Sequence, residues 1–278
     1  MSAEADIIFG FIIGIIAYVM LYLGKGIQKF AIEGLKIDKK IKSKNSGLWL
    51  FGLVLTVSYM FIQWAALIFA PINLIAPLEG LGLVVLMIFS YYVIKEEIQK
   101  IQIIGVVFIV IGTILITLFN PNTGEISIST FNFELYLAFS LILIGGALIV
   151  VFISKIKNWV GAGFILGTTA GIFSVFQTAS KRITAIPDDT IRLFFTGSTF
   201  LMATITLLFT QFAFTKANAN IVVPCYTAVA IPLAVLTGVI TLNEIIEFIQ
   251  IVGIVFIIAG IIFLTAFKKE GELLDQSL

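Results

Sequence analysis

The sequence contains no histidine and a single cysteine, Cys225, among its 278 residues. One cysteine excludes a disulfide within the chain, and the lack of histidine excludes zinc and haem sites that depend on imidazole ligands. Any proton carrier inside the protein must then be a carboxylate, a tyrosine or a lysine. Charge is also scarce, at 12% of residues, and the net charge of +1 gives no indication of nucleic-acid binding.

Apolar residues take the place of the missing charge. They make up 60% of the chain and give a mean hydropathy of +1.13. They fall into runs of about 20 residues, which is long enough for a helix to cross the hydrocarbon core. The sequence therefore predicts an all-α polytopic membrane protein. Because the acidic Glu4 and Asp6 precede the first run, we expect that run to be a retained span and not a signal peptide.

Nine transmembrane helices are predicted from these runs. They cover residues 7–23, 47–66, 73–94, 101–119, 134–153, 160–179, 191–212, 220–242 and 248–267. With this assignment, all basic residues except Lys181, Arg182 and Arg192 fall on one side. Positive charge marks the cytoplasmic side, so we expect the N-terminus outside and the C-terminus in the cytoplasm.

Segments about half the chain apart are near-copies of each other. Residues 95–112 match 243–260, residues 66–77 match 213–224, and residues 10–17 match 163–170. Corresponding spans lie five crossings apart, and an odd separation reverses their direction. The sequence thus predicts two inverted repeats, spans 1–4 and 6–9, joined by span five. Inverted repeats are typical of secondary transporters that work by alternating access.

The expected organisation follows from these repeats. Residues 1–119 form the first transmembrane repeat, 120–159 a polar loop with the linker span, 160–267 the second repeat, and 268–278 a cytoplasmic tail. We interpret the basic segment 25–46, between the first two spans, as an interfacial loop attracted to anionic lipid.

Glu79 is the acidic residue that lies furthest inside a predicted span, in the segment INLIAPLEGLGLVVL. A carboxylate that faces hydrocarbon is costly, so an intramembrane Glu normally faces a cavity or a partner and marks an ion or substrate path. We interpret Glu79 as the group that binds a cation or a proton. The alternative is a structural Glu that is neutral or hydrogen-bonded near the outer interface.

Other polar and aromatic side chains inside the spans are candidates for lining a substrate path. They are Tyr59, Gln63, Trp64, Gln177, Gln211 and Tyr226. Each on its own fits a helix–helix hydrogen bond equally well. Polar residues are concentrated in spans one, two, three, six, seven and eight, which favours a common path. Lys181 belongs to the same stripe as Gln177, or extends to the outer interface as a snorkelling charge.

Two prolines occupy matched positions in the repeats, Pro77 in span three and Pro224 in span eight. A proline removes a backbone donor and frees a carbonyl in the preceding turn. We interpret the pair as symmetry-related gates, with Pro77 toward the outside and Pro224 toward the inside. The alternative is a tolerated proline in the first turn of each helix.

The block FAPINLIAPLEGL followed by KEEIQKIQIIGVVFIVIG, repeated as NANIVVP and TLNEIIEFIQIVGIVFIIAG, resembles the drug/metabolite transporter superfamily with its EamA-like domains. The doubled signature pairs Glu96, Gln102 and Gly105 with Glu244, Gln250 and Gly253. This resemblance implies an all-helical inverted-repeat transporter with a central cavity. Within the superfamily, the chain is most similar to the NIPA-type magnesium transporters, and it departs from their pattern at Met60, Gln63 and Glu79.

The predicted function is a secondary transporter that moves a small solute or a divalent cation such as Mg²⁺, with Glu79 as the metal-binding residue. The alternative is a proton-coupled exporter of amino acids or other small organic metabolites. A passive channel or a membrane scaffold is an alternative from a different functional class. The spans lack the paired acids or nucleophile–base sets of an enzyme. We expect no cofactor and no binding of nucleic acid. The expected partners are the lipid bilayer and a cation or small-molecule substrate. The sequence leaves open whether the protein forms a homodimer.

Overall fold

The computed structural model describes residues 3–37, 42–94, 99–119, 121, 126–217 and 219–265. Regular structure in these ranges is entirely helical, and residues 243–247 form a non-helical connection between the last two helices. The elements are α1 (Ala3–Ile37), α2 (Lys42–Phe69), α3 (Ile72–Ile75), η2 (Ala76–Leu78), α4 (Glu79–Phe89), η3 (Ser90–Ile94), α5 (Lys100–Leu118), η4 (Ile128–Thr130), α6 (Phe133–Ile156), α7 (Ala162–Ile183), α8 (Asp189–Lys216), α9 (Ala219–Leu242) and α10 (Phe248–Thr265).

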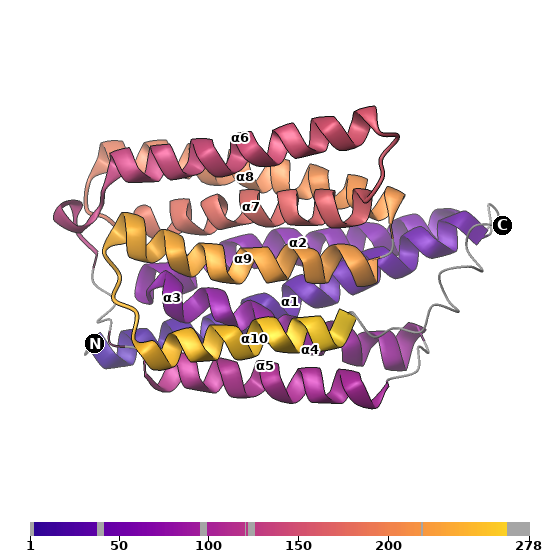
Figure 1. The fold of residues 1–278 in the computed structure, drawn as a ribbon, viewed down its shortest axis with the longest axis horizontal. Coiled ribbons are helices and arrows are strands. Elements are labelled where there is room, and N and C mark those ends of the chain that lie inside the picture. Colours follow the sequence, from indigo (N-terminus) through magenta and orange to yellow (C-terminus); the bar gives the residue numbers. More distant parts are fainter. Residues whose placement is uncertain are drawn as a thin grey trace.

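The described helices include eight that are long and apolar enough to cross a membrane, and α10 is a shorter apolar helix. The prediction of an all-α polytopic membrane protein is therefore confirmed. The long helices run side by side along the longest axis of the molecule, with α6 at one edge and α5 at the other (Figure 1). α1 packs against α2 and α4, α7 packs against α8, α9 and α6, and α5 packs against α10.

Burial in this bundle is the reverse of that in a soluble protein. Large apolar side chains face outward: Leu193 is 76% exposed and Phe248 is 75% exposed. Charged and polar side chains such as Lys181, Arg182 and Gln63 are almost completely buried. Hydrocarbon accepts the apolar exterior at no cost, whereas polar groups must be satisfied inside the protein.

Glycines hold α5 and α10 in close contact. A Cβ atom at Gly260 would lie 2.6 Å from the carbonyl oxygen of Gly105, and one at Gly253 would lie 2.7 Å from that of Gly112. Phe108 and Phe256, which are matched in the repeated sequence, stack with their ring centroids 5.1 Å apart. Small residues at such an interface let the helix backbones approach each other.

The first helix is longer than predicted. α1 continues to Ile37 and α2 begins at Lys42, so the prediction of a loop over residues 25–46 is wrong for residues 25–37 and 42–46, and Lys25 and Lys29 are buried. The helix continues because its packing continues: Gly24 lies against Gly52 of α2, and Gly26 lies against Phe89 of α4. The segment also lacks proline, and lysine, glutamine and alanine are good helix formers.

The two matched prolines lie in different local structures. Pro77 lies in the 3₁₀ turn η2, which divides the predicted third span into α3 and α4. Pro224 and Pro232 lie inside α9, which runs without interruption from Ala219 to Leu242. Glu79 is the first residue of α4, and its backbone N–H donates to the carbonyls of Ala76 and Pro77.

We expect Gly260→Val to destabilise the protein, because its side chain would collide with the backbone of α5. Overpacking of this kind costs about 1–3 kcal/mol or more. Thermal unfolding of the purified protein in detergent measures the loss. The matched control is Gly197→Ala, which meets no atom within 4 Å and should unfold close to the wild-type temperature. Equal unfolding temperatures for both variants would contradict this packing.

Candidate substrate cavity

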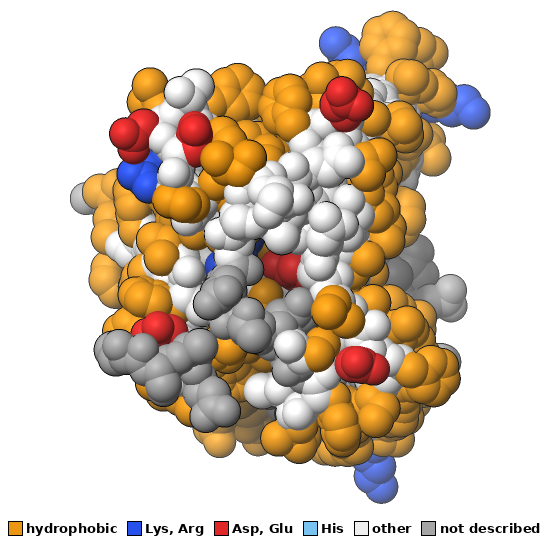
Figure 2. All heavy atoms as spheres, turned by 90° about the vertical axis from the view of Figure 1, so that its left-hand side faces the viewer, with side chains coloured by type: hydrophobic (Ala, Val, Ile, Leu, Met, Phe, Trp, Pro, Cys, Tyr) orange, Lys and Arg blue, Asp and Glu red, His pale blue; other side chains and the backbone are white. Residues whose placement is uncertain are grey.

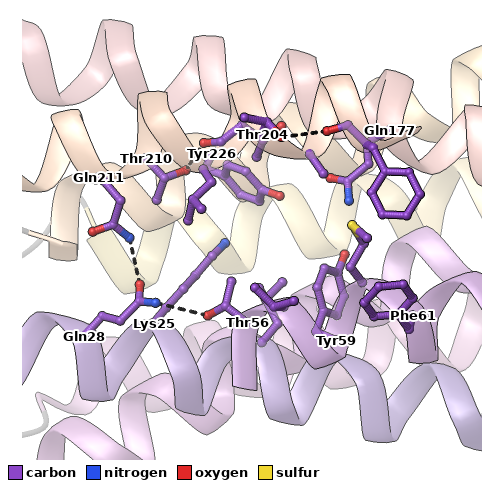
Figure 3. A pocket seen from close by; sticks show the side chains of 17 residues that line it. Lys25, Gln28, Thr56, Tyr59, Phe61, Gln177, Thr204, Thr210, Gln211 and Tyr226 are labelled. Carbon is purple, nitrogen blue, oxygen red and sulfur yellow. Dashed lines mark hydrogen bonds between the residues drawn. The ribbon is translucent and has the colours of Figure 1, made fainter. Parts of the chain in front are cut away.

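A cavity of about 250 Å³ lies between α1 and α2 on one side and α7, α8 and α9 on the other (Figure 3). Four of the predicted path residues line it: Tyr59 from α2, Gln177 from α7, Gln211 from α8 and Tyr226 from α9. Apolar residues such as Met60, Phe61 and Phe200 form much of the remaining wall. Both halves of the chain therefore contribute to one cavity, and the sequence-based candidates from four different helices meet there.

At one end of the cavity, side-chain amides join the two halves. Gln211 donates through Nε2 to Oε1 of Gln28 at 2.8 Å, and Trp49 donates through Nε1 to Oε1 of Gln211 at 3.4 Å. Gln28 in turn donates to the hydroxyl of Thr56 at 3.5 Å. These residues lie where α8 ends and α2 begins, which is the predicted cytoplasmic end.

Glu79 is buried beside the cavity and does not line it. Its side chain is 3% exposed, and its Oε1 accepts a hydrogen bond of 3.3 Å from the hydroxyl of Tyr22. The same Tyr22 hydroxyl hydrogen-bonds to Thr227 of α9. The ammonium groups of Lys25 and Lys181 are near enough to act electrostatically on the Glu79 carboxylate. Glu79 therefore faces partners within the protein and not lipid, and its role in binding an ion stays a prediction.

Lys25 is a cavity residue that the sequence-based interpretation misses. It is 5% exposed, it lines the cavity, and its Nζ lies 3.7 Å from the ring centroid of Tyr226 and 4.9 Å from that of Tyr22. The signal was present in the sequence. Tyr18, Tyr22, Lys25 and Lys29 recur at helical spacing and so lie on one face, whereas the basic character of a segment that follows an apolar run favours a loop.

Lys181 is fully buried, so the snorkelling alternative is wrong. Its Nζ donates to Oε1 of Gln63 at 2.6 Å and lies 5.2 Å from the ring centroid of Tyr59. Gln63 donates through Nε2 to the hydroxyl of Tyr18 at 2.8 Å. This cluster joins α7 to α1 and α2. Gln63 therefore lies in a buried polar network and is not among the residues that line the cavity.

Trp64 also lies outside the cavity lining. Its Nε1 donates to the hydroxyl of Thr184 at 2.7 Å, and its ring packs edge-on against Phe200 with centroids 6.0 Å apart. The indole thus joins α2 to the end of α7 and to α8. This geometry corresponds to the helix–helix hydrogen bond that the sequence left open for each of these residues.

The opposite end of the bundle, the predicted outer end, is held together by Glu244. Its Oε1 and Oε2 accept hydrogen bonds from the backbone N–H groups of Ile72 at 2.9 Å and Asn73 at 3.0 Å. Nε of Arg182 lies 3.8 Å from Oε1 of Glu244, and Nη1 of Arg182 donates to the carbonyl of Leu67 at 2.9 Å. This Arg182–Glu244 cluster ties α7, α2 and α3 to the connection between α9 and α10.

Figure 2 looks directly onto this end of the molecule, where acidic and basic side chains lie recessed near the middle of a largely apolar and uncharged surface. The repeat comparison identifies Glu244 as the partner of Glu96, but it places Glu244 in a loop and gives no indication of its contacts. Its ion pair with Arg182 depends on how α7 packs against the α9–α10 connection. Glu96 lies outside the described residues.

The described residues contain no group of three or more His, Cys, Asp and Glu side chains that could hold a metal ion. Glu79 is a buried carboxylate beside the cavity, and its binding of a metal ion stays a prediction.

Comparison with known proteins agrees with this arrangement. Residues 5–270 match the family model described as "Magnesium transporter NIPA". The chain belongs to the NIPA magnesium transporter family. A mouse relative, NIPA-like protein 2, is 31% identical over 121 residues, which cover 42% of this chain and 31% of the relative. The probable magnesium transporter NIPA3 of Arabidopsis thaliana is 24% identical over 239 residues, which cover 79% of this chain and 64% of that protein.

The probable magnesium transporter NIPA6 of Arabidopsis thaliana is 27% identical over 75 residues, which cover 27% of this chain and 23% of that protein. The matched segments thus span less than two thirds of the length of each relative. No solved structure shows significant similarity to the chain. The family match confirms the sequence-based resemblance to NIPA-type proteins. This NIPA-family chain is a multi-pass membrane protein of a cation transporter family.

Glu244 should give this NIPA-family protein a distinct pH dependence. Burial raises the pKa of its carboxyl above the ordinary value of 4.5, while Arg182 and the backbone N–H groups of Ile72 and Asn73 oppose the shift. A raised pKa favours the protonated form in the folded state, so the associated stability is present below the unfolded-state pKa and is lost as pH rises through the folded-state pKa.

We therefore expect the unfolding temperature of the wild type to fall, relative to that of Glu244→Gln, as pH rises from about 4.5. Thermal unfolding of both proteins across a pH series measures the difference. Glu134→Gln, at an exposed position, serves as the matched control and should run parallel to the wild type. A constant difference between wild type and Glu244→Gln would show that Glu244 does not titrate in this way.

Proposed function

We propose that this NIPA-family protein is a secondary transporter that moves Mg²⁺ or a similar divalent cation by alternating access between two inverted repeats. The observation that carries the proposal is a cavity formed by helices of both halves, with the buried carboxylate of Glu79 beside it. Family membership supports a cation as the transported species. The two relatives from Arabidopsis thaliana are each described as a probable magnesium transporter.

The packing of the helices supports the inverted repeats. α1 packs against α2 and α4, and α7 packs correspondingly against α8 and α9. The last helices of the two proposed repeats, α5 and α10, pack against each other through matched glycines. α6 lies outside both sets and packs mainly on α7, as suits a linker span between residues 1–119 and 160–267.

The same correspondence suggests how the two ends alternate. The offset between residues 10–17 and 163–170 places Lys29 opposite Arg182, and the match of the C-terminal segments places Glu96 opposite Glu244. We propose that the Arg182–Glu244 cluster closes the outer end and that the Gln28–Gln211 contact has the corresponding role inside. Pro77 and Pro224 would then lie near the outer and inner gates, with the N-terminus outside and the C-terminus in the cytoplasm.

A second candidate function has one specific observation in its favour. The cavity wall includes Met60, Phe61 and Phe200, and apolar and aromatic linings of this kind are typical of sites for small organic molecules. A proton-coupled exporter of small organic metabolites would use Glu79 as the proton carrier. Both candidates are transporters, in keeping with the family.

We expect Glu79→Gln to reduce saturable Mg²⁺ uptake strongly, because the amide keeps the shape of the side chain but cannot supply a negative charge. Uptake should fall about tenfold or more, since a charge-assisted contact contributes roughly 1.5–3 kcal/mol. The measurement uses proteoliposomes with a Mg²⁺-sensitive dye in the lumen.

Glu134→Gln is the matched control and should transport like the wild type, because Glu134 is exposed. Size-exclusion chromatography and thermal unfolding establish that both variants fold. Unchanged Mg²⁺ uptake by the folded Glu79→Gln variant would refute the proposal that Glu79 binds the transported cation. If the wild type itself shows no Mg²⁺ uptake, the result favours the second candidate function, a proton-coupled exporter of small organic metabolites.

Closure of the outer end can be tested with a disulfide between the halves. A Cβ atom at Gly238 of α9 would lie 3.6 Å from Cβ of Ile72 in α3, which is within the usual disulfide spacing of about 3.5–4.5 Å. We expect the pair Ile72→Cys and Gly238→Cys, in a Cys225→Ser background, to lose transport when oxidised and regain it when reduced.

Gly238→Cys alone is the essential control, because the new Cβ would also lie 2.6 Å from Oε2 of Glu244 and displace the end of that side chain. Oxidant should leave transport by this single variant unchanged. If the cross-linked protein transports as well as the reduced protein, α3 and α9 do not separate during transport, and alternating access at this interface is refuted.

A further inference from the structure

We propose that Lys25 forms an anion-binding site in the central cavity, where it holds the carboxylate or phosphate group of a small solute. This site goes beyond the proposed transport of a divalent cation and does not depend on it. It lies on the α1 side of the cavity and faces α8 and α9, whereas Glu79 lies outside the lining.

The first observation is a buried ammonium group without a hydrogen-bond acceptor. Lys25 is 5% exposed, and no acceptor in the described part of the chain reaches its Nζ. Figure 3 shows the side chain directed away from α1 and into the space between the two groups of helices, toward Tyr226. A buried charge is costly unless it is paired and hydrogen-bonded.

The surroundings of Lys25 do not supply that pairing. The face of the Tyr226 ring, 3.7 Å from Nζ, provides a cation–π contact but does not accept the three N–H donors of an ammonium group. Glu79 acts on Lys25 only through its field, because no hydrogen bond from Lys25 Nζ to the Glu79 carboxylate is present in the described part of the chain. Gln28 and Gln211, the neighbouring amides, are hydrogen-bonded to each other.

The second observation is an unpartnered hydroxyl on the opposite wall. Thr206 of α8 lines the same cavity, is 9% exposed, and its Oγ1 has no hydrogen-bond partner among the described residues. The neighbouring Thr204 and Thr210 also line the cavity, but each donates to a carbonyl of its own helix. Thr206 is therefore placed to donate to a ligand between α1 and α8.

Together, these groups define the chemistry of the ligand. An ammonium and a hydroxyl with free donors suit the oxygen atoms of an anion. The apolar wall of Met60, Phe61 and Phe200 suits an apolar body attached to it. A small organic acid satisfies both requirements, whereas free phosphate satisfies only the first, so we favour an organic carboxylate.

The test is thermal unfolding of the full-length protein in detergent, with phenylacetate, phenylacetamide or inorganic phosphate at equal ionic strength. A ligand that binds the folded state raises the unfolding temperature in proportion to its affinity. Phenylacetate should stabilise the wild type and neutral phenylacetamide should not. In Lys25→Met, which keeps the aliphatic stem, the apparent affinity for phenylacetate should fall about tenfold or more.

Three further variants make the result specific. Lys25→Arg should retain binding because it retains the charge. Thr206→Val should weaken binding severalfold, and it tests the same site if Lys25→Met fails to fold. Lys216→Met removes a lysine at the exposed end of α8 and should bind phenylacetate like the wild type. Without any ligand, Lys25→Met should be at least as stable as the wild type, because it loses an unpaired buried charge.

Stabilisation by phosphate alone, dependent on Lys25, would support the site and identify free phosphate as its source. The proposal is overturned if phenylacetamide stabilises as well as phenylacetate, if Lys25→Met keeps the full effect, or if none of the anions gives a Lys25-dependent shift. Mg²⁺ uptake by the wild type is measured separately in proteoliposomes. Because the anion effect is measured as an unfolding temperature and not as a flux, a Lys25-dependent effect of phenylacetate stands whether or not the wild type takes up Mg²⁺, and the two proposals can fail independently.

Discussion

A charge inside a membrane protein has to find its partners within the protein, because the surrounding hydrocarbon offers none. This constraint shapes the whole interior of the bundle. Glu244 is paired with Arg182 and with the first N–H groups of α3, Lys181 with Gln63, and Glu79 with Tyr22. Each of these contacts joins different helices, so the charges that must be buried also determine which helices stay together.

Polar contacts join the two halves at both ends of the bundle as well as beside the cavity, whose lining includes Lys25, Thr206 and Tyr226. The Gln28–Gln211 pair joins α1 to α8 at the predicted cytoplasmic end, and Glu244 joins the α9–α10 connection to α3 at the predicted outer end. Contacts at the ends that cross between the two halves, with a chamber between them, are the geometry that alternating access requires. In the proposed cycle, one set would open while the other stays closed.

Charge links the two proposals made for the cavity. Two basic side chains, Lys25 and Lys181, lie near a single carboxylate, Glu79, so a cation that binds there would also meet these two lysines. An anion bound at Lys25 would lower the positive charge that an entering cation meets. Cation transport and anion binding are therefore compatible within the same cavity, although each stands on its own observations.

The sequence by itself determined the membrane class, the helical spans, the repeated segments and the burial of Glu79, because these depend on hydropathy and on the spacing of residues along a single helix. It also identified Tyr59, Gln177, Gln211 and Tyr226, which do line one cavity. Only the tertiary structure decided that Lys25 belongs to that cavity, that Trp64 and Gln63 serve helix contacts, and that Glu244 caps α3. The physical reason is that the partner of a polar group is set by the helix packed against it, which the local sequence does not specify.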